Sequence, residues 1–178
     1  MLRYAAALRS VYVDAFCAPP WGEDESRADA FLERLADDRH RPGFTAVLAF
    51  TGGGLAGFAT AWTTPAPFPT DRRHPQAAAA LGPRRTADWL CGALGVDELA
   101  VRPKAHGTGI ATALLTTVTT TAPDGRAWLL TSLRNPRALA FYAREGWTRT
   151  THPAPAGDGV VVLLGPRHPA RARAPRGV

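Results

Sequence analysis

The chain has 178 residues and a hydrophobic fraction of 46%, which suits one domain with a packed core. It contains no run of about 18 apolar residues, so we expect no membrane-spanning helix and no membrane partner. Cys17 and Cys91 form no C-x-x-C pattern and are too few for a disulfide framework. We therefore expect a cytoplasmic protein with free thiols.

The net charge of +6 is concentrated near the C-terminus. The stretch after residue 165 contains four arginines and no acidic residue: Arg167, Arg171, Arg173 and Arg176. Aromatic residues do not interleave with them, as a surface that stacks on nucleic acid bases would need. We predict one domain over residues 1–165 and a basic, disordered tail over residues 166–178, with no nucleic-acid partner.

The first third of the chain predicts two helices and a β-hairpin. Apolar residues recur at helical spacing over residues 2–16 and 26–38, and Pro19-Pro20 ends the first helix. Residues 44–50 and 55–63 are apolar, strand-like runs on either side of a glycine-rich turn, so they form a hairpin.

The rest of the chain alternates between strands and helices. An insertion over residues 75–94 carries a helix that is interrupted at Gly82-Pro83. The elements that follow are a strand at 96–101, a helix at 109–121, a strand at 127–132, a helix at 136–145, and strands at 147–151 and 160–164 joined by a loop at 153–159. This order predicts a mixed α/β domain in which helices flank a central sheet. We expect the last two strands to be edge strands, which could pair two copies in a homodimer.

A glycine-rich bend is the first segment with a chemical signature. His106-Gly107-Thr108-Gly109-Ile110-Ala111 follows a strand and opens a helix. The first turn of a helix presents unpaired N–H groups and partial positive charge, and glycines let a phosphate come close. Thr112 replaces the third glycine of a dinucleotide fingerprint, and the G-x-x-x-x-G-K-[ST] loop is absent. A plain strand–helix turn without a ligand remains the alternative.

The second segment is the helix that begins after Asn135. Asn135 stands where an N-cap is expected, and Ala138, Phe141 and Tyr142 share one helical face. Read alone, Asn135 is an N-cap and Tyr142 a core residue.

Together the two segments resemble the GNAT superfamily of N-acetyltransferases. The resemblance rests on Val101-x-Pro103 with the bend, and on N-x-x-A-x-x-F-Y-x-x-x-G-W over residues 135–147. It covers residues 96–150 closely, and the hairpin and the closing strands follow the same order. The resemblance implies a single-domain GNAT-like fold.

The resemblance also implies a cofactor and residue roles. The co-substrate is acetyl-CoA, no metal is used, and the acetyl group passes directly to an amine. Backbone groups at Leu99, Ala100 and Val101 hold the pantetheine arm, and Asn135 contacts the same arm. The pyrophosphate is held by the bend and its helix: His106, Gly107, Thr108, Gly109, Ile110, Ala111 and Thr112. Tyr142 lies beside the thiol sulfur as general acid or hydrogen-bond donor.

The attacking amine must lose a proton, so a base or a water relay is needed. Glu98 shares a strand face with Ala100, which makes it our candidate base, directly or through water. Asp97 is the competitor. Alternatively, Glu98 only faces solvent or forms an ion pair.

Three features depart from the family. His106 stands where Gln or Arg is usual, so its charge depends on pH. Leu130 replaces the glutamate of members that acetylate the N-terminus of a ribosomal protein. The family begins with a strand, whereas this chain begins inside the first helix, so that strand is either absent or upstream of Met1.

We predict a small-molecule amine as acceptor, with the insertion before Leu94 shaping its pocket. The alternatives are protein lysines or N-termini, and a non-catalytic module that binds acyl-CoA or a polyanion. The presence of Tyr142 and of both glycines of the bend favours an enzyme.

Overall fold

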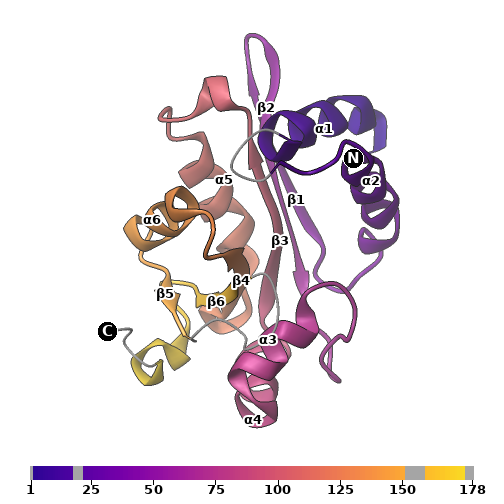
Figure 1. Ribbon diagram of the computed structural model, residues 1–178. Helices are drawn as coiled ribbons and strands as arrows, with labels where there is room; N and C mark the ends of the chain where they lie inside the picture. Colours follow the sequence, from indigo (N-terminus) through magenta and orange to yellow (C-terminus); the bar gives the residue numbers. More distant parts are fainter. Residues whose placement is uncertain (1, 18–21, 151–158, 175–178) are drawn as a thin grey trace. The chain divides into compact units, whose positions relative to one another are not determined.

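The computed structural model describes residues 2–17, 22–150 and 159–174 (Figure 1). The expected stop at Pro19-Pro20, most of the 153–159 loop and the last four residues lie outside these ranges. The chain divides into two compact units. The first comprises Met1–Trp62 and Asp97–Thr120, and the second comprises Thr63–Val96 and Thr121–Val178.

Six strands form one mixed sheet in the order β1-β2-β3-β4-β6-β5. Their bounds are β1 Thr45–Thr51, β2 Gly54–Thr63, β3 Leu94–Val101, β4 Ala127–Ser132, β5 Thr148–Arg149 and β6 Val160–Leu164. β3 and β4 are parallel, whereas β1–β2, β4–β6 and β5–β6 are antiparallel. The predicted fold class, a mixed sheet flanked by helices, is confirmed. The prediction of two closing edge strands is wrong for β6, because β6 pairs with β4 on one side and β5 on the other.

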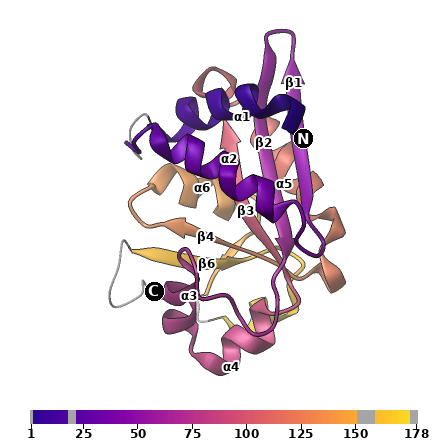
Figure 2. The same ribbon diagram turned by 90° about the vertical axis from the view of Figure 1, so that its right-hand side faces the viewer.

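The first unit packs helices on both faces of its strands. Its helices are η1 Leu2–Tyr4, α1 Ala5–Tyr12, η2 Val13–Cys17, α2 Ser26–Asp38, η4 Pro103–Ala105, α5 Ile110–Val118 and η5 Thr119–Thr121. α1 and α2 lie side by side across β2 and β3 (Figure 2). Leu8 of α1, Phe31 of α2 and Phe58 of β2 are almost fully buried in their shared core. A Cβ added at Gly57 would lie 3.1 Å from the Leu114 side chain, so α5 covers the opposite face.

The second unit contains the insertion, which breaks at Gly82 as predicted. Its helices are α3 His74–Leu81, α4 Pro83–Arg85, η3 Thr86–Leu90, η6 Pro123–Gly125, α6 Pro136–Arg144 and η7 Pro169–Arg173. Trp89 and Leu90 of the insertion join Trp128 and Leu164 in one buried cluster. The apolar side chains of the insertion therefore build the core of this unit. None of the described helices is long and apolar enough to cross a membrane.

The basic stretch from residue 166 is folded as far as the structure describes it. His168 is 3% exposed, and its Nε2 lies 2.9 Å from the Trp89 carbonyl oxygen. The Ala170 N–H donates to His168 Nδ1, and Ala170 packs in the buried cluster of this unit. The expected disorder does not hold for residues 166–174, because Ala170 and Ala174 are buried while Arg171 donates to Thr148 Oγ1. Residues 175–178 lie outside the described chain.

Candidate functional site

Strand β3 carries the predicted base and the predicted pantetheine-binding backbone. Ala100 is 1% exposed in the core under α1 and α2, and Val101 lies on the other face, near Gly57. The alternation that the sequence predicts for this strand is therefore present. By the same alternation, Glu98 shares the face of Ala100, and the half-buried Leu99 shares the face of Val101.

Glu98 is neither a free strand end nor fully exposed. Its side chain is 18% exposed, and its Oε1 lies 3.4 Å from Nη2 of Arg34 on α2. The ion pair weighed as an alternative for Glu98 is thus observed. Asp97 belongs to the same strand and is half-buried.

A buried phenol lies next to this ion pair. The Tyr12 hydroxyl donates to Glu23 Oε2 at 2.8 Å, and its ring stacks on Phe31. Burial raises the pKa of Tyr12 well above its usual range, and the negative charges of Glu98 and Glu23 raise it further. Tyr12 is therefore a neutral hydrogen-bond donor at any physiological pH.

The bend after β3 has the geometry of an anion cradle. Gly107 and Gly109 have φ values of +80° and +83°, and no described atom lies within 4 Å of a Cβ added at either. Gly109 is the N-cap of α5, and no side chain among the described residues caps that helix end. Its first-turn N–H groups, those of Ile110, Ala111 and Thr112, belong to the helix end that carries partial positive charge.

Two side chains of the bend turn back onto their own chain. His106 Nε2 lies 3.0 Å from the Val101 carbonyl oxygen, and the Thr108 hydroxyl donates to the Ala105 carbonyl at 2.7 Å. These bonds brace the bend against the end of β3. They also leave the space over the two glycines open to a ligand. His106 therefore stabilises the bend, and it is also a candidate hydrogen-bond donor to phosphate.

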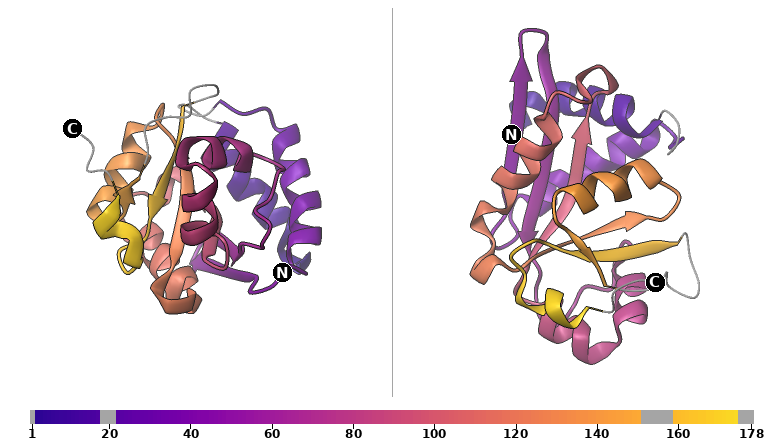
Figure 3. Two further views of the ribbon diagram at one scale, coloured as in Figure 1. Left: turned by 90° about the horizontal axis from the view of Figure 1, so that it is seen from below. Right: turned by 90° about the vertical axis from the view of Figure 1, so that its left-hand side faces the viewer.

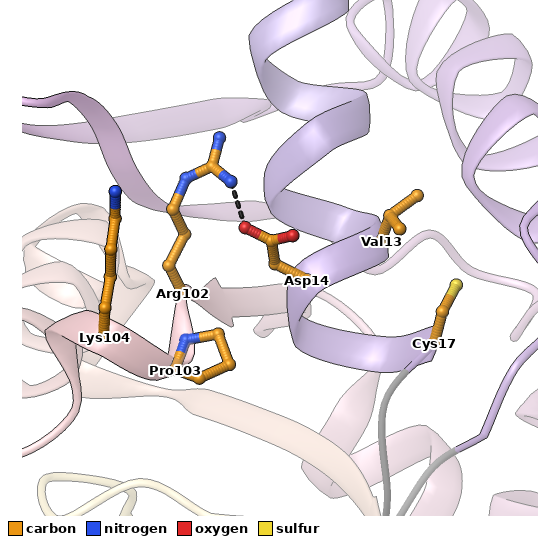
Figure 4. Close-up of a pocket in the computed structure, with 6 residues that line it drawn as sticks. All are labelled: Val13, Asp14, Cys17, Arg102, Pro103 and Lys104. Carbon is orange, nitrogen blue, oxygen red and sulfur yellow. Dashed lines mark hydrogen bonds and ion pairs between the residues drawn. The ribbon is translucent and has the colours of Figure 1, made fainter.

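An open pocket of about 510 Å³ adjoins this bend within the first unit. It is lined by Val13, Asp14, Cys17, Arg102, Pro103 and Lys104 (Figure 4). Arg102 bonds Asp14 through Nη1, donates to Ser10 Oγ through Nη2 and donates to the Leu55 carbonyl through Nε. Arg102 thus ties the end of α1 and η2 to β2, while Lys104 supplies an exposed positive charge at the pocket.

Asn135 and Tyr142 belong to the second unit. Asn135 is 7% exposed and caps α6, because its Oδ1 accepts the Ala138 N–H at 2.9 Å. Tyr142 is half-buried, with its ring 5.2 Å from Phe141 and 6.0 Å from Trp147 between centroids. Tyr142 lies on α6, seven positions after the Asn135 cap, and α6 packs on β4 (Figure 3, right).

The first unit brings together Glu98, the β3 backbone and the whole bend from His106 to Thr112. Sequence reasoning missed Arg34, Tyr12 and the Asp14–Arg102 pair. Arg34 follows the buried Phe31 by three residues, so the helical period placed it beside the core face of α2. No sequence signal linked it to a strand 64 residues further on. Among the described residues, no group of three or more His, Cys, Asp or Glu side chains could hold a metal ion.

Solved structures provide the first comparison, and three of them share the fold over most of both chains. An acetyltransferase from Corynebacterium glutamicum, described as histone acetyltransferase HPA2 and related acetyltransferase, has a TM-score of 0.61 at 19% identity, covering 94% of this chain and 93% of its own. The ribosomal-protein-S18-alanine N-acetyltransferase from Escherichia coli has a TM-score of 0.55 at 16% identity, with 94% and 90% covered. The PaiA N-acetyltransferase from Thermoplasma acidophilum, in complex with coenzyme A, has a TM-score of 0.57 at 12% identity, with 92% and 93% covered.

The three structures named are at most 19% identical to this chain and show only the fold, so family membership is decided by sequence comparison. No curated protein matches the chain significantly. A family model described as the acetyltransferase (GNAT) family, however, matches residues 6–147, which span both units and every candidate residue of the site. The chain therefore belongs to the GNAT family of acetyltransferases.

Proposed function

We propose that the protein transfers an acetyl group from acetyl-CoA directly to a primary amine on a small molecule. The observation that carries this proposal is the open, uncapped N-terminus of α5 behind Gly107 and Gly109, in a chain of the GNAT family. The free thiols of Cys17 and Cys91 suit a reducing compartment such as the cytoplasm.

The bend fits the diphosphate of a coenzyme A thioester. Backbone N–H groups at a helix N-terminus bind phosphate without needing a charged side chain. The glycines leave room above them, and Lys104, three residues before Gly107, lines the pocket described above. The PaiA relative with coenzyme A bound shares the fold of this chain, which supports the same class of ligand here. Acetyl-CoA, when bound, supplies the activated acetyl thioester.

Two side chains of this chain move the protons. Glu98 takes a proton from the acceptor ammonium, directly or through a water molecule, so that the amine becomes a nucleophile. Tyr142 donates a hydrogen bond or its phenolic proton to the departing sulfur. The β3 backbone at Leu99 to Val101 orients the acyl group, and orientation alone is worth a large share of the rate.

A small acceptor is favoured over a protein by the surroundings of Glu98. The Glu98 side chain is 18% exposed and lies on the sheet face under α1 and α2. An extended polypeptide would need an open groove to reach it. The family resemblance also places Leu130 at the position where enzymes that acetylate the N-terminus of a ribosomal protein have a glutamate. Acetylation of protein lysines or N-termini is the second candidate, and a non-catalytic acyl-CoA-binding module is the third.

The test is release of free CoA thiol from acetyl-CoA, measured with a panel of small primary amines and with peptides that carry a lysine or a free N-terminus. We expect acetylated small amines, identified by mass spectrometry, with higher kcat/KM than any peptide. Better turnover of peptides would favour the second candidate. Binding of acetyl-CoA without turnover of any amine would favour the third.

A further inference from the structure

We propose that Arg34 is a positioning residue for catalysis, which holds the Glu98 carboxylate ionised and oriented toward the face of the sheet under α1 and α2. This inference rests on the proposed function, because it assigns a role to Arg34 through the base of that reaction.

Within the first unit, the side chains of Arg34 and Glu98 meet between α2 and the sheet. The Arg102 N–H donates to the Ala56 carbonyl at 2.9 Å, which ties β3 to β2 at one end. Phe58 and Ala100 both pack in the core under α1 and α2, so Thr60 and Glu98, two residues along each strand, lie on that face too. Arg34 reaches Glu98 from α2, across this same face.

Among the described groups near Glu98, Arg34 supplies a positive charge at ion-pair distance. Tyr12 of α1 lies near Glu98 and donates to Glu23 of the segment before α2, while Arg34 of α2 contacts Glu98 itself. Asp97 is its neighbour on β3, and Thr60 on β2 is uncharged. The Tyr12 phenol is neutral and Glu23 is acidic, so neither group favours ionisation of Glu98. Arg34 is the positively charged group whose ion pair with Glu98 is described.

A base must be ionised before it can accept a proton, and partial burial of a carboxylate opposes its ionisation. The guanidinium of Arg34 offsets this tendency and limits the rotamers that Glu98 can adopt. Thr60 is 2% exposed, and its Oγ1 has no hydrogen-bond partner among the described residues, so this hydroxyl is available to a polar group of a substrate on this face.

The experiment compares wild type with Arg34→Gln, Arg34→Lys and Glu98→Gln. Arg27→Gln is the matched control, because Arg27 is an exposed arginine on the same helix. Two readouts are taken for each: the pH profile of kcat in the CoA-release assay, and the pH titration of the Glu98 side-chain carboxyl carbon by NMR. Glu98→Gln assigns that resonance by its disappearance. Circular dichroism verifies that each variant is folded.

Removal of an opposite charge at this distance shifts a carboxyl titration by about one pH unit or more. Since Arg34 is partly exposed, we expect Arg34→Gln to move both the NMR midpoint and the acidic limb of kcat upward by about one unit. Arg34→Lys should restore most of the shift, and Arg27→Gln should match wild type. The KM for acetyl-CoA should not change in any of these variants.

An unshifted Glu98 titration in Arg34→Gln, or an equal shift in Arg27→Gln, would overturn the inference. It is also overturned if Glu98→Gln keeps the wild-type acidic limb, because Glu98 is then not the base. Failure of the proposed function is a different result, since it shows as no CoA release from wild type with any amine. The NMR titration still decides in that case whether Arg34 controls the ionisation of Glu98.

Discussion

Substituting Gly109 by alanine separates the cost of folding the bend from its role in binding. The residue has φ +83° and ψ −5°, a left-handed conformation that costs an L-residue about 1–2 kcal/mol. For a chain of this size, that cost corresponds to a decrease in Tm of about 2–8 °C. The new methyl group would meet no described atom within 4 Å, so the folded chain itself has room for it.

The same methyl group would occupy the space in which we place the diphosphate. A hydrogen bond from an N–H group to a charged oxygen contributes about 1.5–3 kcal/mol, so losing one weakens binding roughly ten- to hundredfold. Gly54→Ala is the matched control, because Gly54 also has a positive φ of +101° and open space around its Cα, but belongs to the hairpin. Calorimetric titration with acetyl-CoA and thermal unfolding are measured on both variants.

We expect both variants to lose stability and only Gly109→Ala to lose affinity. If Gly109→Ala binds acetyl-CoA as tightly as Gly54→Ala and wild type do, the bend does not hold the diphosphate and the reasoning fails.

Three further predictions concern other parts of the chain. Tyr142→Phe should lower kcat at least tenfold and leave the Kd for CoA nearly unchanged, and equal kcat across the pH range would exclude an acid role. Leu90→Ala, at a position 0% exposed in the insertion, should lower the free energy of unfolding by about 2–5 kcal/mol in urea titrations, and a loss below about 1 kcal/mol would show that the insertion is not core. Burial lowers the pKa of His168, whose Nδ1 accepts the Ala170 N–H, so the unfolded chain binds the proton more tightly than the folded chain does. The stabilisation by neutral His168 should be complete above about pH 6.5 and should be lost as the pH falls through the lower pKa of the folded state. His168→Asn keeps an acceptor for the Ala170 N–H and does not titrate, so an identical pH dependence of this variant would refute the assignment.

Local patterns predicted much of the secondary structure and the glycine bend. The helix over 26–38 has the predicted bounds, and the insertion breaks at Gly82 because proline cannot continue the preceding helix. The positive φ values of Gly107 and Gly109 follow from the need for a sharp turn between β3 and α5. These features depend on residues close in sequence.

Composition was misleading at the C-terminal end. The four arginines after residue 165 predicted a solvated tail, but Ala170 and His168 between them fill space against Trp89 and the rest of the second unit. Charge describes only the exposed side of such a segment, and whether its small residues are buried depends on a partner surface that lies far away in the sequence.

The sequence by itself determined the order of the elements, the glycine bend and the family resemblance, because each of these depends on near neighbours along the chain. Only the tertiary structure decided which distant side chains meet. Arg34 reaches Glu98 across 64 positions, and Arg102 joins Asp14 across 88. Such contacts follow from how helices pack on a sheet, and the spacing of residues within one helix or strand carries no information about them.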